Sequence, residues 1–147
     1  MKDVKVLVLL VMTMLIGVPI TACRRTPDEV QVRAAIAAGA QAVQAGSASD
    51  LGAVLTDDFD GNAGELGRRD LVRMVAGLAL RGEHVGATTG PIAIERRGDR
   101  LVADFTVTLT SGGRVLPDRL GVYRAETAWR REGGHWRCYR AAWKRSL

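Results

Sequence analysis

The sequence predicts one α+β domain, because its apolar residues change period part-way along the chain. From residue 28 to residue 81 they recur at helical spacing, and from residue 84 onward they alternate with polar residues as in strands. The 147 residues leave about 125 for this domain once an apolar leader is set aside. We expect three N-terminal helices packed on a curved, mainly antiparallel sheet of four to five strands.

The first helix is expected to begin at the start of the domain and to end at a glycine. Thr26 can cap it, Pro27 suits the first helical position, and Glu29 completes a capping box. Apolar residues then continue at helical spacing up to Gly46, which is typical of a helix C-terminus.

Two shorter helices are expected next. Residues 47–50 offer a cap for a helix that runs to Leu55, and a loop is expected over residues 60–67. A third helix is predicted over residues 69–81 and closed by Gly82. Its expected apolar face consists of Leu71, Met74, Val75 and Leu78.

The second half of the domain alternates with a period of two. Turns containing glycine are expected at residues 97–99, 111–113 and 132–134. They separate predicted strands at residues 84–89, 92–96, 101–110, 120–131 and 135–144.

The N-terminus has the features of an export signal. Lys2 and Lys5 flank a charge-free apolar run over residues 6–16, and small residues lead to Cys23. The run Ile20-Thr21-Ala22-Cys23 resembles the lipobox of bacterial lipoproteins. This resemblance implies a signal peptide over residues 1–22, a lipidated Cys23 with a short tether over residues 23–27, and a domain over residues 28–147. The alternative is an uncleaved anchor, and both place the domain outside the cytoplasm.

Two further consequences concern Arg24 and Cys138. In lipoprotein sorting an aspartate after the lipidated cysteine favours the inner membrane, and this chain has Arg24 there. The resemblance therefore implies the outer membrane, facing the periplasm. Cys138 lies in a strand-like run, where a small buried hydrophobe is expected rather than a reactive thiol.

Three segments of the domain resemble the nuclear transport factor 2-like superfamily, also called SnoaL-like or ketosteroid isomerase-like. They are Leu55-Thr56-Asp57-Asp58-Phe59, Gly67-Arg68-Arg69-Asp70-Leu71, and the run from Trp129 to Arg137. The resemblance implies a cone-shaped, cystatin-like roll with a pocket inside. Some members are isomerases or dehydratases, and others bind ligands without catalysis, so the fold leaves the function open.

A catalytic site of this fold would need a carboxylate base and a hydrogen-bond donor for an enolate oxygen. The candidate bases are Asp57, Asp58 and Asp104, and the candidate donors are Tyr123, His84 and Tyr139. The favoured interpretation of each is structural: a helix end, a solvated strand face or a strand edge. The spacing of His, Cys and carboxylates predicts no metal, and no cofactor is expected. We therefore favour a non-catalytic protein.

Charge is divided unevenly along the chain. Residues 24–95 carry 7 basic and 10 acidic side chains, whereas residues 96–147 carry 12 basic and 5 acidic ones. Because the chain is exported, the expected partner of this basic half is not nucleic acid. Phospholipid headgroups, lipopolysaccharide or an acidic ligand remain as candidates.

The last hairpin is the candidate binding surface. A turn near residue 133 would place Trp129 opposite Trp136, and Thr127 opposite Cys138. The other face would then carry Arg124, Arg130, Arg137 and Tyr139. The favoured alternative is a pair of core tryptophans backed by solvated arginines.

These features together predict a lipid-anchored periplasmic domain that uses a cone pocket or a basic sheet face to bind a small ligand or an envelope partner. The first alternative is a ketosteroid isomerase-like or dehydratase-like enzyme for a small hydrophobic substrate. The second is a structural homodimer.

Overall fold

The computed structural model describes residues 26–111 and 121–146, so the leader and Cys23 lie outside the described residues. Within these ranges the chain forms three helices and seven strands, and the expected α+β class is confirmed. In chain order they are α2 (Asp28–Ala45), α3 (Ala48–Val54), β1 (Leu55–Gly61), β2 (Leu66–Gly67), α4 (Arg68–Leu80), β3 (Val85–Thr89), β4 (Ala93–Arg97), β5 (Arg100–Ser111), β6 (Gly121–Glu132) and β7 (His135–Arg145).

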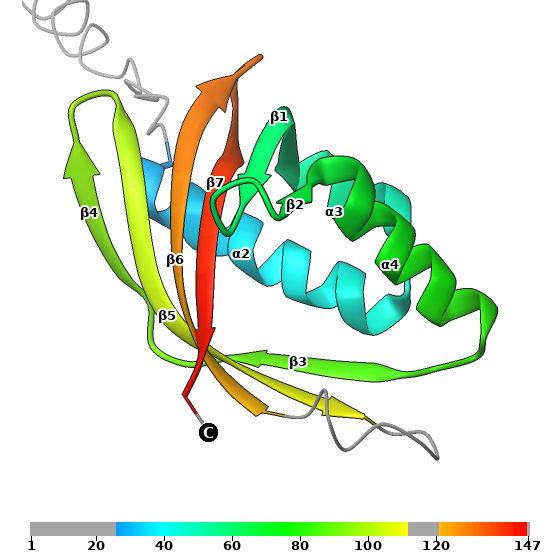
Figure 1. The fold of residues 1–147 in the computed structure, drawn as a ribbon. Helices are drawn as coiled ribbons and strands as arrows, with labels where there is room; N and C mark the ends of the chain where they lie inside the picture. Colours follow the sequence, from blue (N-terminus) through cyan, green and yellow to red (C-terminus); the bar gives the residue numbers. More distant parts are fainter. Residues whose placement is uncertain (1–25, 112–120, 147) are drawn as a thin grey trace, which may run out of the picture.

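The strands form one mixed sheet that curves around α2 (Figure 1). Its order is β2-β1-β7-β6-β5-β3, and β4 also pairs with β5. β3 and β4 share β5, since β4 pairs with its first half and β3 with its second half. The pairing of β1 with β7 is parallel and the other pairings are antiparallel.

The expected number of four to five strands was wrong because of the segment that follows α3. We expected a helix end and a loop there, but Leu55–Gly61 is β1, and β2 follows it. Asp57 and Asp58 are exposed, while Thr56 and Phe59 are buried. A break in register between Leu55 and Asp60 disrupts the two-residue alternation, and this hides the strand in the sequence.

The helix boundaries were predicted closely, apart from the first cap. Pro27 occupies the N-cap of α2 and no side chain caps it, so the expected Thr26 cap and capping box were wrong. The Gln31 amide instead donates to the Thr26 carbonyl at 2.6 Å. Gly46 ends the helix with a φ of 66°, a conformation that glycine adopts without strain.

The two later helices start as expected. Ser47 caps α3 by accepting a hydrogen bond from the Asp50 N–H at 3.3 Å. Asp70 accepts one from the Gly67 N–H at 2.8 Å and so fixes the start of α4. Met74 was placed on the apolar face of α4, but 48% of its surface is exposed.

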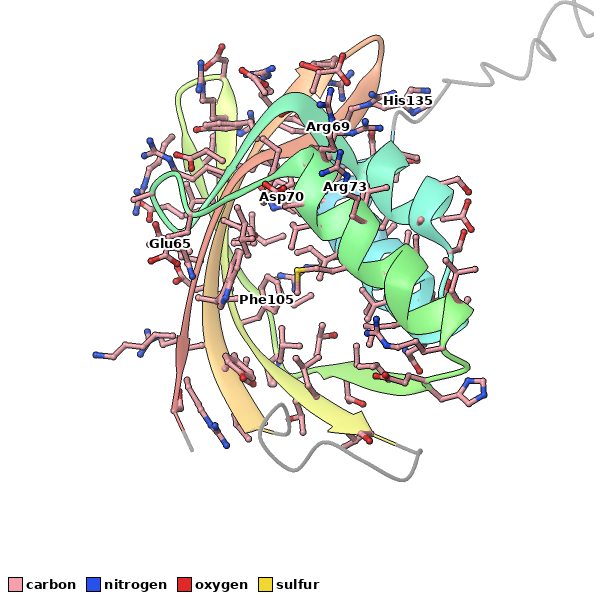
Figure 2. The ribbon with its side chains drawn as sticks, turned by 45° about the vertical axis from the view of Figure 1, so that its right-hand side comes forward. Glu65, Arg69, Asp70, Arg73, Phe105 and His135 are labelled. Carbon is pink, nitrogen blue, oxygen red and sulfur yellow. The ribbon has the colours of Figure 1, made fainter. Side chains whose placement is uncertain are left out.

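The core lies between α2 and the concave face of the sheet. Val32 of α2 and Leu101 of β5 are fully buried there, and Phe105 packs at its margin (Figure 2). The expected pairing of the last hairpin was wrong because the turn lies one residue later than expected. Glu132 pairs with His135, so Trp129 lies opposite Cys138 and Trp136 opposite Arg131. A bulge between Ala128 and Trp129 adds a further shift, so Thr127 lies opposite Ala141.

Both tryptophans of that hairpin are nevertheless buried, as the favoured interpretation expected, although they do not lie opposite each other. Trp129 is 3% exposed, and its Nε1–H donates to Thr127 Oγ1 at 2.8 Å. The Thr127 hydroxyl in turn donates to the Ala103 carbonyl at 3.3 Å, so this buried polar pair is satisfied.

None of the helices in residues 26–111 and 121–146 has the length and the apolar composition that a membrane-spanning helix needs.

Two glycine substitutions test this packing with opposite expected signs. A Cβ at Gly61 would lie 2.9 Å from both the Leu66 carbonyl oxygen and Trp143 Cη2. Gly61→Ala should therefore lower the free energy of unfolding by about 1–3 kcal/mol. In α2 a Cβ at Gly39 would meet Val54 at an ordinary 3.6 Å, so Gly39→Ala should raise it by about 0.5–1 kcal/mol. Urea denaturation followed by circular dichroism measures both, and equal stabilities would contradict the packing.

Candidate functional site

The antiparallel pairing of β5 with β6 brings two hairpin turns to one end of the sheet. The β4–β5 turn contains Gly98 and the β6–β7 turn contains Gly133, both with positive φ. Because Leu101 pairs with Trp129, the start of β5 lies beside the end of β6. Helix α2 also begins at this end (Figure 1).

These elements enclose a pocket of about 540 Å³. Three of its walls carry arginines, one wall being the end of β4, another the start of β5 and the third the end of β6. The start of α2 completes it. Its lining residues are Thr26, Pro27, Asp28, Arg96, Asp99, Arg100, Arg130, Arg131 and Trp136.

Asp28 accepts hydrogen bonds from three other residues that line the pocket. Its Oδ2 accepts a hydrogen bond from Arg96 Nη2 at 2.7 Å. Its Oδ1 accepts from Arg131 Nη2 at 2.7 Å and from Trp136 Nε1 at 3.3 Å. One carboxylate in the first turn of α2 therefore joins that helix to β4, β6 and β7. The Arg131 guanidinium also lies over the Trp136 ring, 5.5 Å from its centroid.

Arg130 is held by two carboxylates at the edge of the pocket. Its guanidinium makes a bidentate pair with Asp58, with Nη1–Oδ2 at 3.1 Å and Nη2–Oδ1 at 2.7 Å. It also contacts Glu132 through Nε and Nη2, at 3.0 and 2.8 Å. The hydrogen bond from Arg130 holds the pKa of Asp58 below its usual value, which keeps this carboxylate ionised.

Arg100 has the weakest carboxylate partner among the pocket arginines. Asp99 lies 3.7 Å away and its side chain is 93% exposed, so water screens the pair. The guanidinium of Arg100 lies over the Tyr139 ring, 4.7 Å from its centroid, and Arg130 lies over the same ring at 5.6 Å. Arg100 is thus positioned by an aromatic face rather than neutralised by an acid.

Only some residues of the expected binding surface belong to the pocket. Arg130 and Trp136 line the pocket, and Tyr139 supports two of its arginines. Trp129 belongs to the core, and neither Arg124 nor Arg137 is among the lining residues. The Nε of Arg137 is buried and has no hydrogen-bond partner among the described residues.

The candidate catalytic residues do not converge. The Asp57 side chain is 98% exposed, and Asp58 is paired with Arg130. Asp104 lies opposite Glu126, whereas Tyr123 lies opposite Val107, so alternation puts Asp104 and Tyr123 on opposite faces of the sheet. His84 precedes β3.

Neither metal-ligating groups nor the cysteine of the domain adds to the site. In the parts of the chain that the structure describes, no three His, Cys, Asp or Glu side chains gather as metal ligands do. His135 lies at the start of β7, at the end of the sheet that carries the turns (Figure 2). Cys138 is buried, as expected, and burial raises the pKa of its thiol to about 12.

Five charged residues of the pocket were missed as site residues: Asp28, Arg96, Asp99, Arg100 and Arg131. A signal was present for the arginines, because both hairpins carry them beside the turn and antiparallel neighbours bring such turns to one end. Asp28 gave no such signal, since an acid in the first turn is usual in any helix.

Comparison with known proteins identifies the fold. Neither a protein-family model nor a curated protein matches the sequence. A protein from Novosphingobium aromaticivorans, provisionally described as a scytalone dehydratase, superimposes with a TM-score of 0.71 at 12% identity, covering 82% of this chain and 85% of that one. An NTF2-like protein with a cystatin-like fold from the same organism gives 0.66 at 21% identity, covering 81% and 82%.

A third structure agrees. An NTF2-like protein from Cytophaga hutchinsonii has a TM-score of 0.67 at 13% identity, covering 82% of this chain and 99% of that one. The chain has an NTF2-like fold. The resemblance found in the sequence is therefore confirmed for the fold, and identities this low carry no activity with them.

The contribution of Asp28 to stability can be measured by comparing substitutions at Asp28 and at Glu29. Asp28→Asn removes the negative charge that accepts hydrogen bonds from Arg96, Arg131 and Trp136, so the free energy of unfolding should fall by about 1–2 kcal/mol. Glu29→Gln is the matched control, because this residue is exposed in the same first turn. It should lose only the dipole contribution, about 0.3–0.5 kcal/mol. Losses of equal size in urea denaturation would show that Asp28 acts as any first-turn acid does.

Proposed function

We propose that this protein is an envelope-anchored binding module that takes an anionic group in the arginine pocket at the start of α2. The observation that carries the proposal is that four arginines from three strands line one pocket of about 540 Å³. Pockets of this volume are typical of small-molecule sites. Guanidinium groups match the geometry of carboxylates and phosphates through pairs of parallel N–H donors.

The supply of donors favours an anion, although the charges of the cluster balance. Four arginines and two aspartates line the pocket. Asp58 and Glu132 pair with Arg130 from outside the lining, so the acids in and around the pocket equal the arginines in number. Each guanidinium carries five N–H donors, so the contacts of Arg96 and Arg131 with Asp28 leave donors on the same groups for a second acceptor.

Arg100 is the residue that would make the main contact. Its side chain is 46% exposed, and its acid partner is distant and solvated. Stacking on Tyr139 limits the freedom of its guanidinium, and this lowers the entropy lost when a ligand binds. The surplus of basic residues after residue 95 adds attraction at longer range.

The location remains part of the proposal. The leader over residues 1–22 and the lipobox-like run ending in Cys23 support a lipid anchor, with Arg24 favouring the outer membrane and the periplasmic side. The anchor would hold the pocket in an oxidising compartment, where the single buried Cys138 of the domain is protected from reaction.

The anchor has a direct test. In cells expressing the full chain, labelled palmitate should be incorporated by the wild type and not by Cys23→Ala, which should also keep its leader. Cys138→Ala is the matched control and should be labelled normally, because that thiol is buried in the domain. Equal labelling of wild type and Cys23→Ala would refute lipidation at Cys23.

A dehydratase-like or isomerase-like activity is the second candidate, because one structural neighbour is provisionally described as a scytalone dehydratase and another, from Streptomyces avermitilis, as a dehydratase. The residues present give it less support. Asp58 has its pKa lowered by Arg130 and is thus a weak base, and Asp104 and Tyr123 face opposite sides of the sheet.

Anion binding is tested by thermal unfolding at constant ionic strength, with chloride replaced stepwise by inorganic phosphate. Binding to the folded state contributes about 2.7 kcal/mol at a phosphate concentration near one hundred times Kd, and for a domain of this size it should raise Tm by about 10 °C. Arg100→Gln should abolish most of this rise. Arg140→Gln removes the same charge from an exposed position on β7 outside the pocket and should retain it. A rise that both variants keep, or none in the wild type, would overturn the proposal.

A further inference from the structure

We infer that the anionic group bound by this pocket is the phosphate of a phospholipid headgroup in the membrane that anchors the chain. This inference rests on the proposed function, both on the anchor at Cys23 and on anion binding by the arginines. It adds the identity of the ligand and an orientation of the domain. A free phosphate monoester shares the chemistry, and the experiment below separates the two sources.

The first argument is the length of chain between the anchor and the pocket. Thr26 lines the pocket and follows Cys23 by three residues. Three residues span at most about 10 Å even when fully extended. A lipidated Cys23 therefore keeps this wall of the pocket within about 10 Å of the membrane surface, slightly more than the Debye length of about 8 Å at physiological ionic strength.

The second argument is that the arginines lie at the same end of the domain as Thr26. Arg96 and Arg100 flank the β4–β5 turn, and Arg130 and Arg131 precede the β6–β7 turn. Both turns lie at the end of the sheet where α2 begins, and α2 runs from there along the concave face (Figure 1). The anchor thus brings the four arginines to the headgroup layer together. The basic residues near the start of β6 and the end of β7 lie at the opposite end of the sheet, so the anchor does not bring them there.

The third argument concerns charge. A phosphodiester in a phospholipid carries one negative charge, which matches Arg100, the one pocket arginine whose acid partner is distant and solvated. Arginines near an anionic membrane surface are attracted to it, and the high local concentration of headgroups fills even a weak individual site.

The test uses the full-length lipidated protein in nanodiscs of phosphatidylcholine alone or with 30% phosphatidylglycerol. Hydrogen exchange of the backbone amides of residues 28–31 and 96–100 reports on the pocket. In the anionic discs, exchange of these amides should slow at least tenfold. Arg100→Gln should remove that protection and Arg140→Gln should keep it. A parallel arm adds glycerol 1-phosphate to the neutral discs.

Each outcome decides between the two proposals. Protection by phosphatidylglycerol that depends on Arg100 supports the inference. Protection by glycerol 1-phosphate but not by phosphatidylglycerol overturns the inference and leaves anion binding intact. Protection that Arg140→Gln reduces as much as Arg100→Gln indicates diffuse surface attraction, and this also overturns the inference. No protection in either arm overturns the inference and the proposed function together.

Discussion

The hydrogen bonds to the Asp28 carboxylate hold together the elements that form the pocket. Asp28 is the first residue of α2, and it is shared by Arg96, Arg131 and Trp136 from three different strands. The core holds the middle of α2 through Val32 and Ile36 by contacts without direction. The hydrogen bonds to Asp28 have direction, so they fix where the helix begins relative to the two hairpin turns. Without that fixed start, the beginning of α2 would not be held against the arginines of the two hairpins, and these elements would not line one pocket.

The same carboxylate limits what the pocket can bind. Two arginines side by side repel each other, and Asp28 offsets that repulsion between Arg96 and Arg131. Asp58 and Glu132 do the same for Arg130. Arg100 has only a distant and solvated acid, and it is placed by the ring of Tyr139. The pocket thus combines three arginines that are held in place by acids with one that is positioned but not neutralised, an arrangement suited to a weakly charged anion.

The sequence revealed most of the fold because helices and antiparallel strands leave periodic patterns. It failed at β1, where a break in register interrupts the pattern and two consecutive acids imitate a helix end. It failed again in the last hairpin, where the turn lies one residue later than expected and a bulge between Ala128 and Trp129 adds a further shift, while the tryptophans stay buried. Burial follows from composition and alternation, whereas register depends on where an extra residue is placed, and a single sequence does not encode that in its period.

The pocket was harder to predict than the fold, for a reason that also bears on function. Arg96, Arg130 and Asp28 lie far apart in the sequence, and each is ordinary in its own element. Only the meeting of a helix start with two turns makes them a site. A general base must accept a proton, whereas the hydrogen bond from Arg130 lowers the pKa of Asp58 and so lowers the proton affinity of this carboxylate. The ion pair that holds Arg130 at the edge of the arginine pocket therefore weakens Asp58 as a candidate base.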